Sequence, residues 1–273
     1  MSWRGSVRRV ARTTADRLRS LRGVAVNGQH FHLPFAPPLS IEEPWMADVL
    51  ARLDGFQGAF VDIGANLGQT LLHLRSFGRE RRYLGFEPNV HCAAYAMQLA
   101  AINGFAHTQL IPAACAFRIA VEQLHFFQDS DYDTSASLVE DFRKPGSEPR
   151  SSFVVTAPLE YCLARARVDR VGIVKIDVEG FEATVLGSME PLLAKDRPAI
   201  VIEILPVYST ENNARLAETR RVEQAVTRSS YRLLRIAKAA NGRLAGFEPI
   251  AEIAVHGDMS KADYVLCPSE RAD

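Results

Sequence analysis

The stretch that decides the fold is Val61-Asp62-Ile63-Gly64-Ala65-Asn66-Leu67-Gly68, residues 61–68. Its first residues complete an apolar run over 59–63, which is typical of a buried strand, and apolar residues recur at helical spacing over 67–77. The two glycines allow a tight turn and let a ligand approach where a Cβ atom would collide. The stretch therefore predicts a strand, a turn with a ligand beside it, and a helix.

Apolar runs and helical segments keep alternating after this turn. We expect a strand at 82–86, a helix at 90–103, a strand at 107–111, strands or hairpin arms at 120–127 and 152–156, a strand at 171–176, a helix at 181–193, a strand at 199–205, a helix at 212–227, and closing strands at 231–237 and 263–267. This alternation predicts a doubly wound α/β domain, whose mostly parallel sheet is covered on both faces. The turn signal Asn241-Gly242 between the closing strands predicts an antiparallel strand at the edge of the sheet.

Residues 1–40 form a basic extension ahead of this α/β domain at 41–273, which opens with a short helix ending near Leu53. Residues 1–23 hold seven arginines against one acid, and their apolar residues recur at three- and four-residue spacing. Such a segment can be an amphipathic helix on an anionic membrane surface, a terminal helix packed on the body, or an organelle transit peptide. The sequence leaves these alternatives open.

The composition is that of an ordinary globular protein. The 273 residues are 47% hydrophobic and 23% charged, which excludes a disordered chain and a small disulfide scaffold. The 32 basic and 32 acidic residues cancel, and acids outnumber bases outside the extension, so a nucleic-acid partner is disfavoured. No run approaches the roughly 18 apolar residues of a membrane span. Four scattered cysteines without a C-x-x-C pair predict buried thiols in a reducing compartment, and hence a soluble cytoplasmic protein.

The polar residues of the first turn indicate the kind of ligand. Asp62 precedes the first glycine, so the turn lacks the G-x-G-x-x-G pattern of dinucleotide binders, and a carboxylate there attracts a cation and repels a pyrophosphate. Asn66 and Thr70 can cap the following helix while facing the ligand. Glu87 follows Gly68 by 19 residues, close to the spacing at which an acid accepts the hydroxyls of a ribose.

A second polar group surrounds residues 175–182. Lys175 and Asp177 share one face of an extended strand, and a lysine in an apolar strand needs a partner, for which Asp177, Glu179 and Glu203 are candidates. Glu182 suits the start of the following helix, which is a structural role. Asp177 and Glu203 follow neighbouring strands, and the carboxyl ends of parallel strands are where ligands bind in such sheets. We therefore expect these two residues to act in function.

Four stretches together resemble a known family: VDIGANLG at 61–68, GFEPN at 85–89, KIDVEGFE at 175–182 and PAIVIEI at 198–204. They are similar to the FkbM-type S-adenosylmethionine-dependent methyltransferases, and the resemblance covers about residues 59–205. It implies a class I methyltransferase fold, with a seven-stranded sheet and a reversed edge strand. It also implies transfer of a methyl group to a hydroxyl of a sugar, a glycan or a secondary metabolite.

The resemblance assigns roles to individual positions of this chain. It implies that S-adenosylmethionine is bound by Asp62, Gly64, Ala65, Asn66, Gly68, Thr70, Glu87, Pro88, Asn89, Ala113 and Ala114. The catalytic candidates are Lys175, Asp177, Glu179 and Glu203. As the base that receives the hydroxyl proton we place Asp177 first and Glu203 second, with Lys175 holding the carboxylate ionised. A divalent metal would suit these oxygen ligands, but the visible ligand set is incomplete, so no metal is predicted.

The acceptor is expected to contact the polar loop at 128–151, which is either a lid or collar at the site or a simple insertion. Tyr132 and Phe142 in this loop can stack on a sugar face. Two other functions remain open: a nicotinamide-dependent oxidoreductase, which shares the ribose acid, and a non-catalytic module that binds S-adenosylmethionine. The sequence does not identify the acceptor or the oligomeric state.

Overall fold

The computed structural model describes residues 22–34, 37, 39–41, 43–77, 80–140, 142–143 and 150–271. The amphipathic helix expected within residues 1–23 therefore lies outside the described residues, except for its last two positions. The strands are β1 (Arg22–Val26), β2 (Gln29–Leu33), β3 (Ala59–Ile63), β4 (Tyr83–Phe86), β5 (Thr108–Ile111), β6 (Ala114–Cys115), β7 (Ala120–Phe126), β8 (Arg150–Ala157), β9 (Val171–Ile176), β10 (Ala199–Glu203), β11 (Tyr231–Lys238), β12 (Leu244–Pro249) and β13 (Asp263–Pro268). The helices are α2 (Pro44–Arg52), α3 (Gln69–Arg75), α4 (Val90–Ile102), α5 (Leu159–Ala166), α6 (Glu182–Ser188), α7 (Glu190–Asp196) and α8 (Asn213–Arg228), with short 3₁₀ turns η1 (Met259–Lys261) and η2 (Ser269–Arg271).

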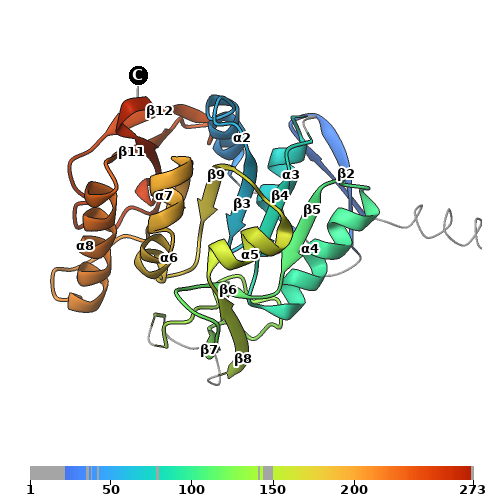
Figure 1. Ribbon diagram of the computed structural model, residues 1–273, viewed down its shortest axis with the longest axis horizontal. Coiled ribbons are helices and arrows are strands. Elements are labelled where there is room, and N and C mark those ends of the chain that lie inside the picture. The colour runs from blue at the N-terminus through green and yellow to red at the C-terminus, as the bar shows by residue number, and fades with distance from the viewer. Residues whose placement is uncertain are drawn as a thin grey trace, which may run out of the picture.

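A mixed sheet forms the centre of the molecule (Figure 1). Among the described residues it has eight strands in the order β12-β11-β13-β10-β9-β3-β4-β5. The five strands from β10 to β5 are parallel, and β13 runs antiparallel to both β10 and β11. The alternation of strands and helices thus gives the predicted α/β sheet.

The sheet has the predicted antiparallel edge strand, but it differs from the sequence prediction in two respects. It has eight strands among the described residues and not the seven that the resemblance implies, and a second reversed strand, β13, lies inside the sheet between β10 and β11. The Asn241-Gly242 turn leads back into an additional strand, β12, which pairs antiparallel with β11 and forms the edge. An Asn-Gly turn favours a tight hairpin, so the next extended segment along the chain pairs with β11.

The helix expected at 181–193 is two helices, α6 and α7, which meet at Met189. Pro191 lies in the first turn of α7, where its missing N–H costs nothing. A proline disfavours helical backbone at the residue before it, and its ring would clash with a preceding helical turn. The chain therefore ends one helix and begins another at this point.

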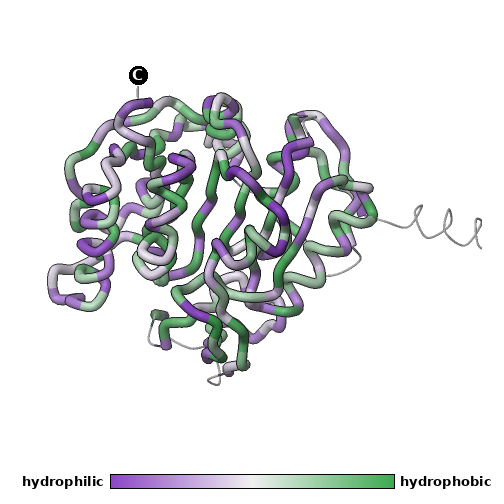
Figure 2. Tube along the Cα trace, viewed as in Figure 1, coloured by the Kyte–Doolittle hydropathy of each residue, from purple (hydrophilic) through white to green (hydrophobic). Residues whose placement is uncertain are grey.

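Two hydrophobic cores cover the two faces of the sheet. One contains α5, α6, α7 and α8, packed on side chains such as Ile63, Phe86 and Ile176. The other contains α2 and α3, packed on side chains such as Phe60 and Tyr83. Figure 2 shows the hydrophobic residues concentrated along the central strands. Coverage on both faces confirms the doubly wound prediction.

Two smaller sheets flank the central one. The strands β6, β8 and β7 form a three-stranded sheet, in which β7 and β8 are the antiparallel arms expected from the sequence. The strands β1 and β2 form a hairpin that was not predicted, although the Asn27-Gly28 dipeptide at its turn was a signal for it. This hairpin packs through Val26 and Phe31 on α3 and α4. The domain boundary placed at residues 40 and 41 remains a prediction.

The register of the parallel strands brings the polar residues together. Asp62 of β3 pairs with Lys175 of β9, and Val201 of β10 pairs with Lys175 from the other side. The N–H of Asp177 donates a hydrogen bond to the carbonyl oxygen of Ile63 at 2.9 Å, which fixes the loop after β9 against the end of β3. The carboxyl ends of three adjacent strands therefore meet at one point.

Cys92, Cys115, Cys162 and Cys267 are free and buried, as the sequence predicts. Within the part of the chain that the structure describes, no helix combines the length and the apolar character needed to cross a membrane.

Candidate active site

The turn after β3 is closed against the loop that follows β9. Gly64 has a φ of 86°, and a Cβ atom on it would lie 1.8 Å from the carbonyl oxygen of Asp177, so only glycine fits there. Gly68, with a φ of 92°, is the N-cap of α3, and no side chain caps that helix within the described residues. The expectation that Asn66 or Thr70 caps α3 is therefore wrong, because the chain enters the helix through a left-handed glycine.

A first cavity, of about 620 Å³ including the space open to solvent, lies beside this turn. Six of the residues that the sequence assigns to the cofactor line it: Gly64, Asn66, Glu87, Pro88, Ala113 and Ala114. We refer to it as the donor cavity.

Glu87 holds the two loops of the donor cavity together. Its Oε2 accepts a hydrogen bond from the N–H of Asn66 at 2.8 Å, and its Oε1 accepts one from the N–H of Asn89 at 2.8 Å. Burial raises the pKa of Glu87 to about 7, although these two backbone hydrogen bonds act in the opposite direction. A carboxylate oxygen has a second lone pair, so Glu87 can still accept hydrogen bonds from a ligand.

Two predicted cofactor residues lie behind the cavity wall. Asp62 is fully buried; its Oδ2 accepts a hydrogen bond from the Tyr83 hydroxyl at 2.6 Å, and its Oδ1 lies 3.8 Å from the Lys175 ammonium. Asn89 caps α4 by accepting a hydrogen bond from the N–H of His91, and its side-chain amide donates to the carbonyl oxygen of Asp131. The structure thus gives both residues supporting roles, and Tyr83 is a partner that the sequence did not suggest.

A second cavity, of about 1,030 Å³ including open solvent, adjoins the first. It is lined by Leu39, Ser40, Glu43, Gly64, Ala65, Asn66, Leu67, Gln69, Thr70, Thr134, Lys175, Asp177, Glu179 and Glu203. Gly64, Asn66, Thr134, Asp177 and Glu179 line both cavities, so the two meet at these residues. All four predicted catalytic residues line this second cavity, which we refer to as the reaction cavity.

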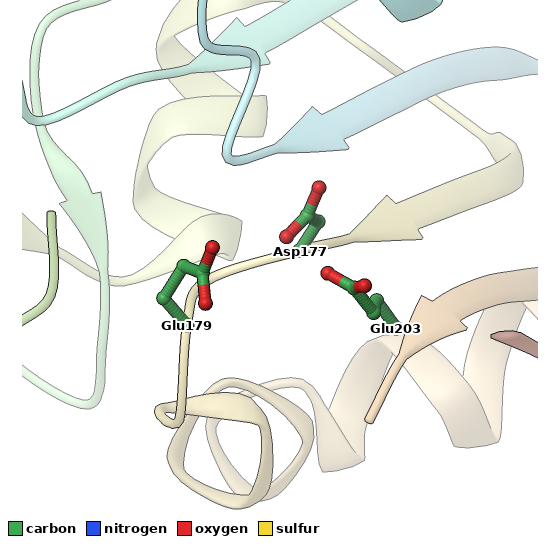
Figure 3. A group of neighbouring side chains, drawn as sticks. All are labelled: Asp177, Glu179 and Glu203. Carbon is green, nitrogen blue, oxygen red and sulfur yellow. The ribbon is translucent and has the colours of Figure 1, made fainter. Parts of the chain in front are cut away.

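Three carboxyl groups converge in the reaction cavity (Figure 3). Asp177 and Glu179 follow β9, Glu203 ends β10, and one carboxylate oxygen of each lies within 4.8 Å of the others. The ammonium of Lys175 donates to Oδ2 of Asp177 at 2.9 Å and to the carbonyl oxygen of Gly64 at 3.2 Å. Of the partners considered for Lys175, the structure selects Asp177, with Asp62 as a second and unforeseen neighbour.

The carboxyl groups differ in protonation. Burial alone would raise the pKa of Asp177, but the charge and hydrogen bond of Lys175 outweigh burial, so this pKa is lowered and Asp177 is ionised. Burial, followed by the negative charge of Asp177, raises the pKa of Glu203 well above its usual range. The two side chains are hydrogen-bonded to each other. Since Glu203 holds its proton at neutral pH, Glu203 donates and Asp177 accepts.

Comparison with known proteins bears directly on this arrangement. The family model described as "Methyltransferase FkbM domain" matches residues 62–233, which include every strand end that contributes to the two cavities. The chain belongs to the FkbM methyltransferase family. This confirms the resemblance drawn from the four sequence stretches.

Solved structures show more distant similarities to this FkbM methyltransferase. The methyltransferase FkbM from Methylobacillus flagellatus KT is 12% identical with a TM-score of 0.46, and the match covers 77% of this chain but only 43% of that one. The fibrillarin of Aeropyrum pernix, solved with natively bound S-adenosyl-L-methionine, is 12% identical with a TM-score of 0.44 over 92% and 83% of the two chains. A precorrin-6y C5,15-methyltransferase from Geobacter metallireducens is 14% identical with a TM-score of 0.42 over 86% and 91%. None of the curated proteins compared with the chain matches it.

The three converging carboxyl groups of this FkbM methyltransferase are also a possible cation site, since their oxygens suit a divalent ion. Two of the three already have cationic partners: Lys175 on Asp177, and Arg143, whose guanidinium lies 2.6 Å from Oε2 of Glu179. Residues of the chain itself thus supply positive charge to the cluster. The sequence shows no complete metal ligand set and leaves the metal requirement open.

The loop after β7 forms one wall of the donor cavity through Asp133, Thr134, Ala136 and Leu138. The hydroxyl of Ser137 donates to the carbonyl oxygen of Glu179 at 2.6 Å, which ties this wall to the loop after β9. These contacts support the lid or collar interpretation of this loop and not that of a simple insertion.

Two aromatic residues of this loop contact protein groups and not a cavity where a sugar would react. Tyr132 packs edge-on against His91 and Tyr95. Phe142 lies against Gly180 and beneath the guanidinium of Arg215. The proposed stacking of these rings on a sugar is not supported.

Glu182 has the structural role expected of it, because its Oε1 accepts the N–H of Gly180 at 2.9 Å.

Proposed function

We propose that this FkbM methyltransferase uses S-adenosylmethionine and methylates a hydroxyl group of a sugar, a glycan or a secondary metabolite. The observation that carries the proposal is the junction of two cavities, one containing Glu87 and the other containing Asp177. A donor in the first cavity and an acceptor in the second would meet at Gly64 and Asn66. The buried free cysteines support a cytoplasmic location, which we propose as well.

The residues of the donor cavity fit the cofactor. Glu87 would accept hydrogen bonds from the ribose hydroxyls, and Ala113 and Ala114 would border the adenine. Gly64 and Asn66, which line both cavities, would lie along the methionine part, with Thr70 of the reaction cavity beside them. The cofactor supplies a methyl group that a sulfonium already activates. The protein then has to align the acceptor oxygen, since positioning can contribute about 7–11 kcal/mol to lowering the barrier.

Asp177 is proposed as the base that receives the proton of the acceptor hydroxyl. It is ionised, its side chain is 36% exposed, and it lines both cavities. Lys175 and Glu203 both donate to it, so they fix its orientation and keep it charged until the proton arrives. Glu203 already holds a proton, so it acts as a positioning residue and not as the base.

Two measurements test the proposed function. Calorimetric titration of the protein with S-adenosylmethionine and with NADH is expected to show binding of the first alone; binding of NADH alone would favour an oxidoreductase and refute the proposal. Incubation of S-adenosylmethionine carrying a labelled methyl group with a metabolite extract is expected to yield a labelled product. Donor binding without any labelled product would instead favour a non-catalytic binding module.

The proposed roles predict different effects for two neighbouring variants. Asp177→Asn is expected to retain donor binding and to lose labelled product by about 100-fold or more, the usual contribution of a general base. Glu203→Gln keeps a side-chain N–H that can donate to Asp177, so we expect a loss below about tenfold, because one neutral hydrogen bond replaces another. A reversed order of the two losses would show that Glu203 is the base.

A further inference from the structure

Glu43 lies on the wall of the reaction cavity, yet no sequence motif points to it. It precedes α2 and lines the cavity together with Lys175, Asp177 and Glu203. Its backbone is left-handed, with a φ of 64° and a ψ of 56°, and the next residue is Pro44. A proline disfavours helical backbone before it, and left-handed backbone is uncommon outside glycine. Such conformations cluster at sites where the surrounding structure enforces them for function.

The other three carboxyl groups of the reaction cavity have partners. Asp177 pairs with Lys175, Glu179 pairs with Arg143, and Glu203 is protonated and hydrogen-bonded to Asp177. Among the described residues, Glu43 has no ion pair within 4 Å and no side-chain hydrogen bond. It is therefore the lining carboxyl group that a bound molecule can pair with.

The charges near Glu43 do not compensate it. Lys175 and Lys238 act on it from beyond ion-pair distance, and Lys238 is already hydrogen-bonded to Asp263. Burial and the negative charge of Asp263 raise the pKa of Glu43 to about 7, while its side chain stays open to the cavity. Glu43 is exposed to the cavity, so a ligand cation in contact would stabilise its charged form and an anion would be repelled.

The polar atoms that face the reaction cavity also require a ligand rich in hydrogen-bond donors. The ionised carboxylate of Asp177 accepts hydrogen bonds only, and Oδ1 of Asn66, which lines the same cavity, is buried without a hydrogen-bond partner. Hydroxyl and ammonium groups are donors that satisfy such atoms, whereas phosphate and carboxylate groups are acceptors and are not. These acceptor atoms therefore favour a polyol, whose hydroxyl groups donate to them, over an acidic ligand.

We propose that Glu43 is an acceptor-binding residue and that the acceptor is an amine-bearing polyol, such as an amino sugar, whose ammonium group pairs with this carboxylate. The proposal rests on the proposed function, because it assumes that the acceptor occupies the reaction cavity. It narrows the acceptor class from hydroxyl compounds in general to those with a protonated amine and without an acidic group.

The test separates the donor from the acceptor. The protein is first loaded with S-adenosylhomocysteine, and failure of this cofactor product to bind would count against the proposed function. The loaded protein is then titrated with glucosamine, glucose and glucuronic acid in a calorimeter. We expect glucosamine to bind at least tenfold more tightly than glucose, and glucuronic acid not to bind. Equal affinities, or no binding by any of the three sugars to the loaded protein, would overturn the amine proposal alone.

Variants of Glu43 complete the test. Glu43→Gln is expected to abolish the preference for glucosamine and to leave the affinity for S-adenosylmethionine within twofold of its original value. Glu43→Asn serves as a second variant, since asparagine tolerates left-handed backbone better than most residues. Glu160→Gln, on the exposed surface of α5, is the matched control and should change neither affinity. A glucosamine preference that survives both Glu43 variants, or a large loss of S-adenosylmethionine affinity, would refute the assignment of Glu43 to the acceptor.

Discussion

The substitution Glu87→Gln tests the proposed donor site most directly. It keeps the size and shape of the side chain but removes its charge. Hydrogen bonds to a charged group contribute about 1.5–3 kcal/mol and neutral ones about 0.5–1.5 kcal/mol, so two bonds to a ribose diol would together lose about 2–3 kcal/mol. At about 1.4 kcal/mol per factor of ten, the dissociation constant of S-adenosylmethionine should rise by about 30- to 150-fold.

The same substitution also affects the apoprotein, and a matched control separates the two effects. The two oxygens of Glu87 accept N–H groups of Asn66 and Asn89, and an amide can serve only one of them. A buried N–H without an acceptor costs about 1–3 kcal/mol of unfolding free energy. Glu182 is likewise buried and its carboxyl group accepts two backbone N–H groups, those of Gly180 and of Glu182 itself, but it lies outside the donor cavity.

Calorimetric titration of both variants with S-adenosylmethionine separates a loss of donor affinity from a loss of stability. Glu182→Gln should lose stability with its donor affinity unchanged, whereas Glu87→Gln should lose both. Urea unfolding measures the stability of each variant and shows whether it is folded under the titration conditions. A Glu87→Gln variant that is folded and binds the donor as tightly as the original protein would refute the ribose assignment.

Three further predictions concern stability. Gly64→Ala should lower the unfolding free energy by about 2–5 kcal/mol, because its Cβ atom would overlap the carbonyl oxygen of Asp177 and its φ is positive; an unchanged urea midpoint would contradict this. Tyr83→Phe leaves a buried oxygen of Asp62 without its donor and should lower the unfolding free energy by about 1–3 kcal/mol in the same assay. A loss below about 0.5 kcal/mol would show that this hydrogen bond is dispensable. Burial raises the pKa of several carboxyl groups above the values of an unfolded chain, so the folded protein binds more protons than the unfolded one between these values. The apoprotein should therefore melt at a lower temperature at pH 8 than at pH 5.5, and the opposite trend would refute the raised pKa values. These groups are Asp62 (pKa about 6), Glu43, Glu87 and Glu179 (about 7) and Glu182 (about 8).

The parts of the site that local patterns encode were predictable from the sequence. The turn at 61–68 combines a buried strand, two glycines and a helix within a few residues, and Glu87 lies at a fixed distance from it. Asp177 and Glu203 were predictable because strands in a parallel sheet end at one edge. Each of these inferences needs only the order of strands along the chain.

The remaining features depend on contacts between distant residues. Glu43 lies well over 100 residues before Asp177, and only the packing of α2 on the sheet brings it to the cavity. The supporting role of Asp62 arises from Tyr83 on the adjacent strand, a cross-strand pairing that no spacing rule encodes. The position of β13 likewise depends on distant contacts, because the segment after β12 leads the chain back between β10 and β11.

The network around Lys175 has a consequence for redesign of the enzyme. Tyr83, Asp62, Lys175, Asp177 and Glu203 form one chain of contacts from the interior of the sheet to the cavity. A substitution anywhere in that chain disturbs the sheet and the chemistry together. Glu43, which precedes α2, stands outside it and has no side-chain hydrogen bond or ion pair among the described residues. A library of variants intended to change substrate preference while preserving turnover should therefore vary Glu43, which precedes α2, and keep the residues of this network unchanged.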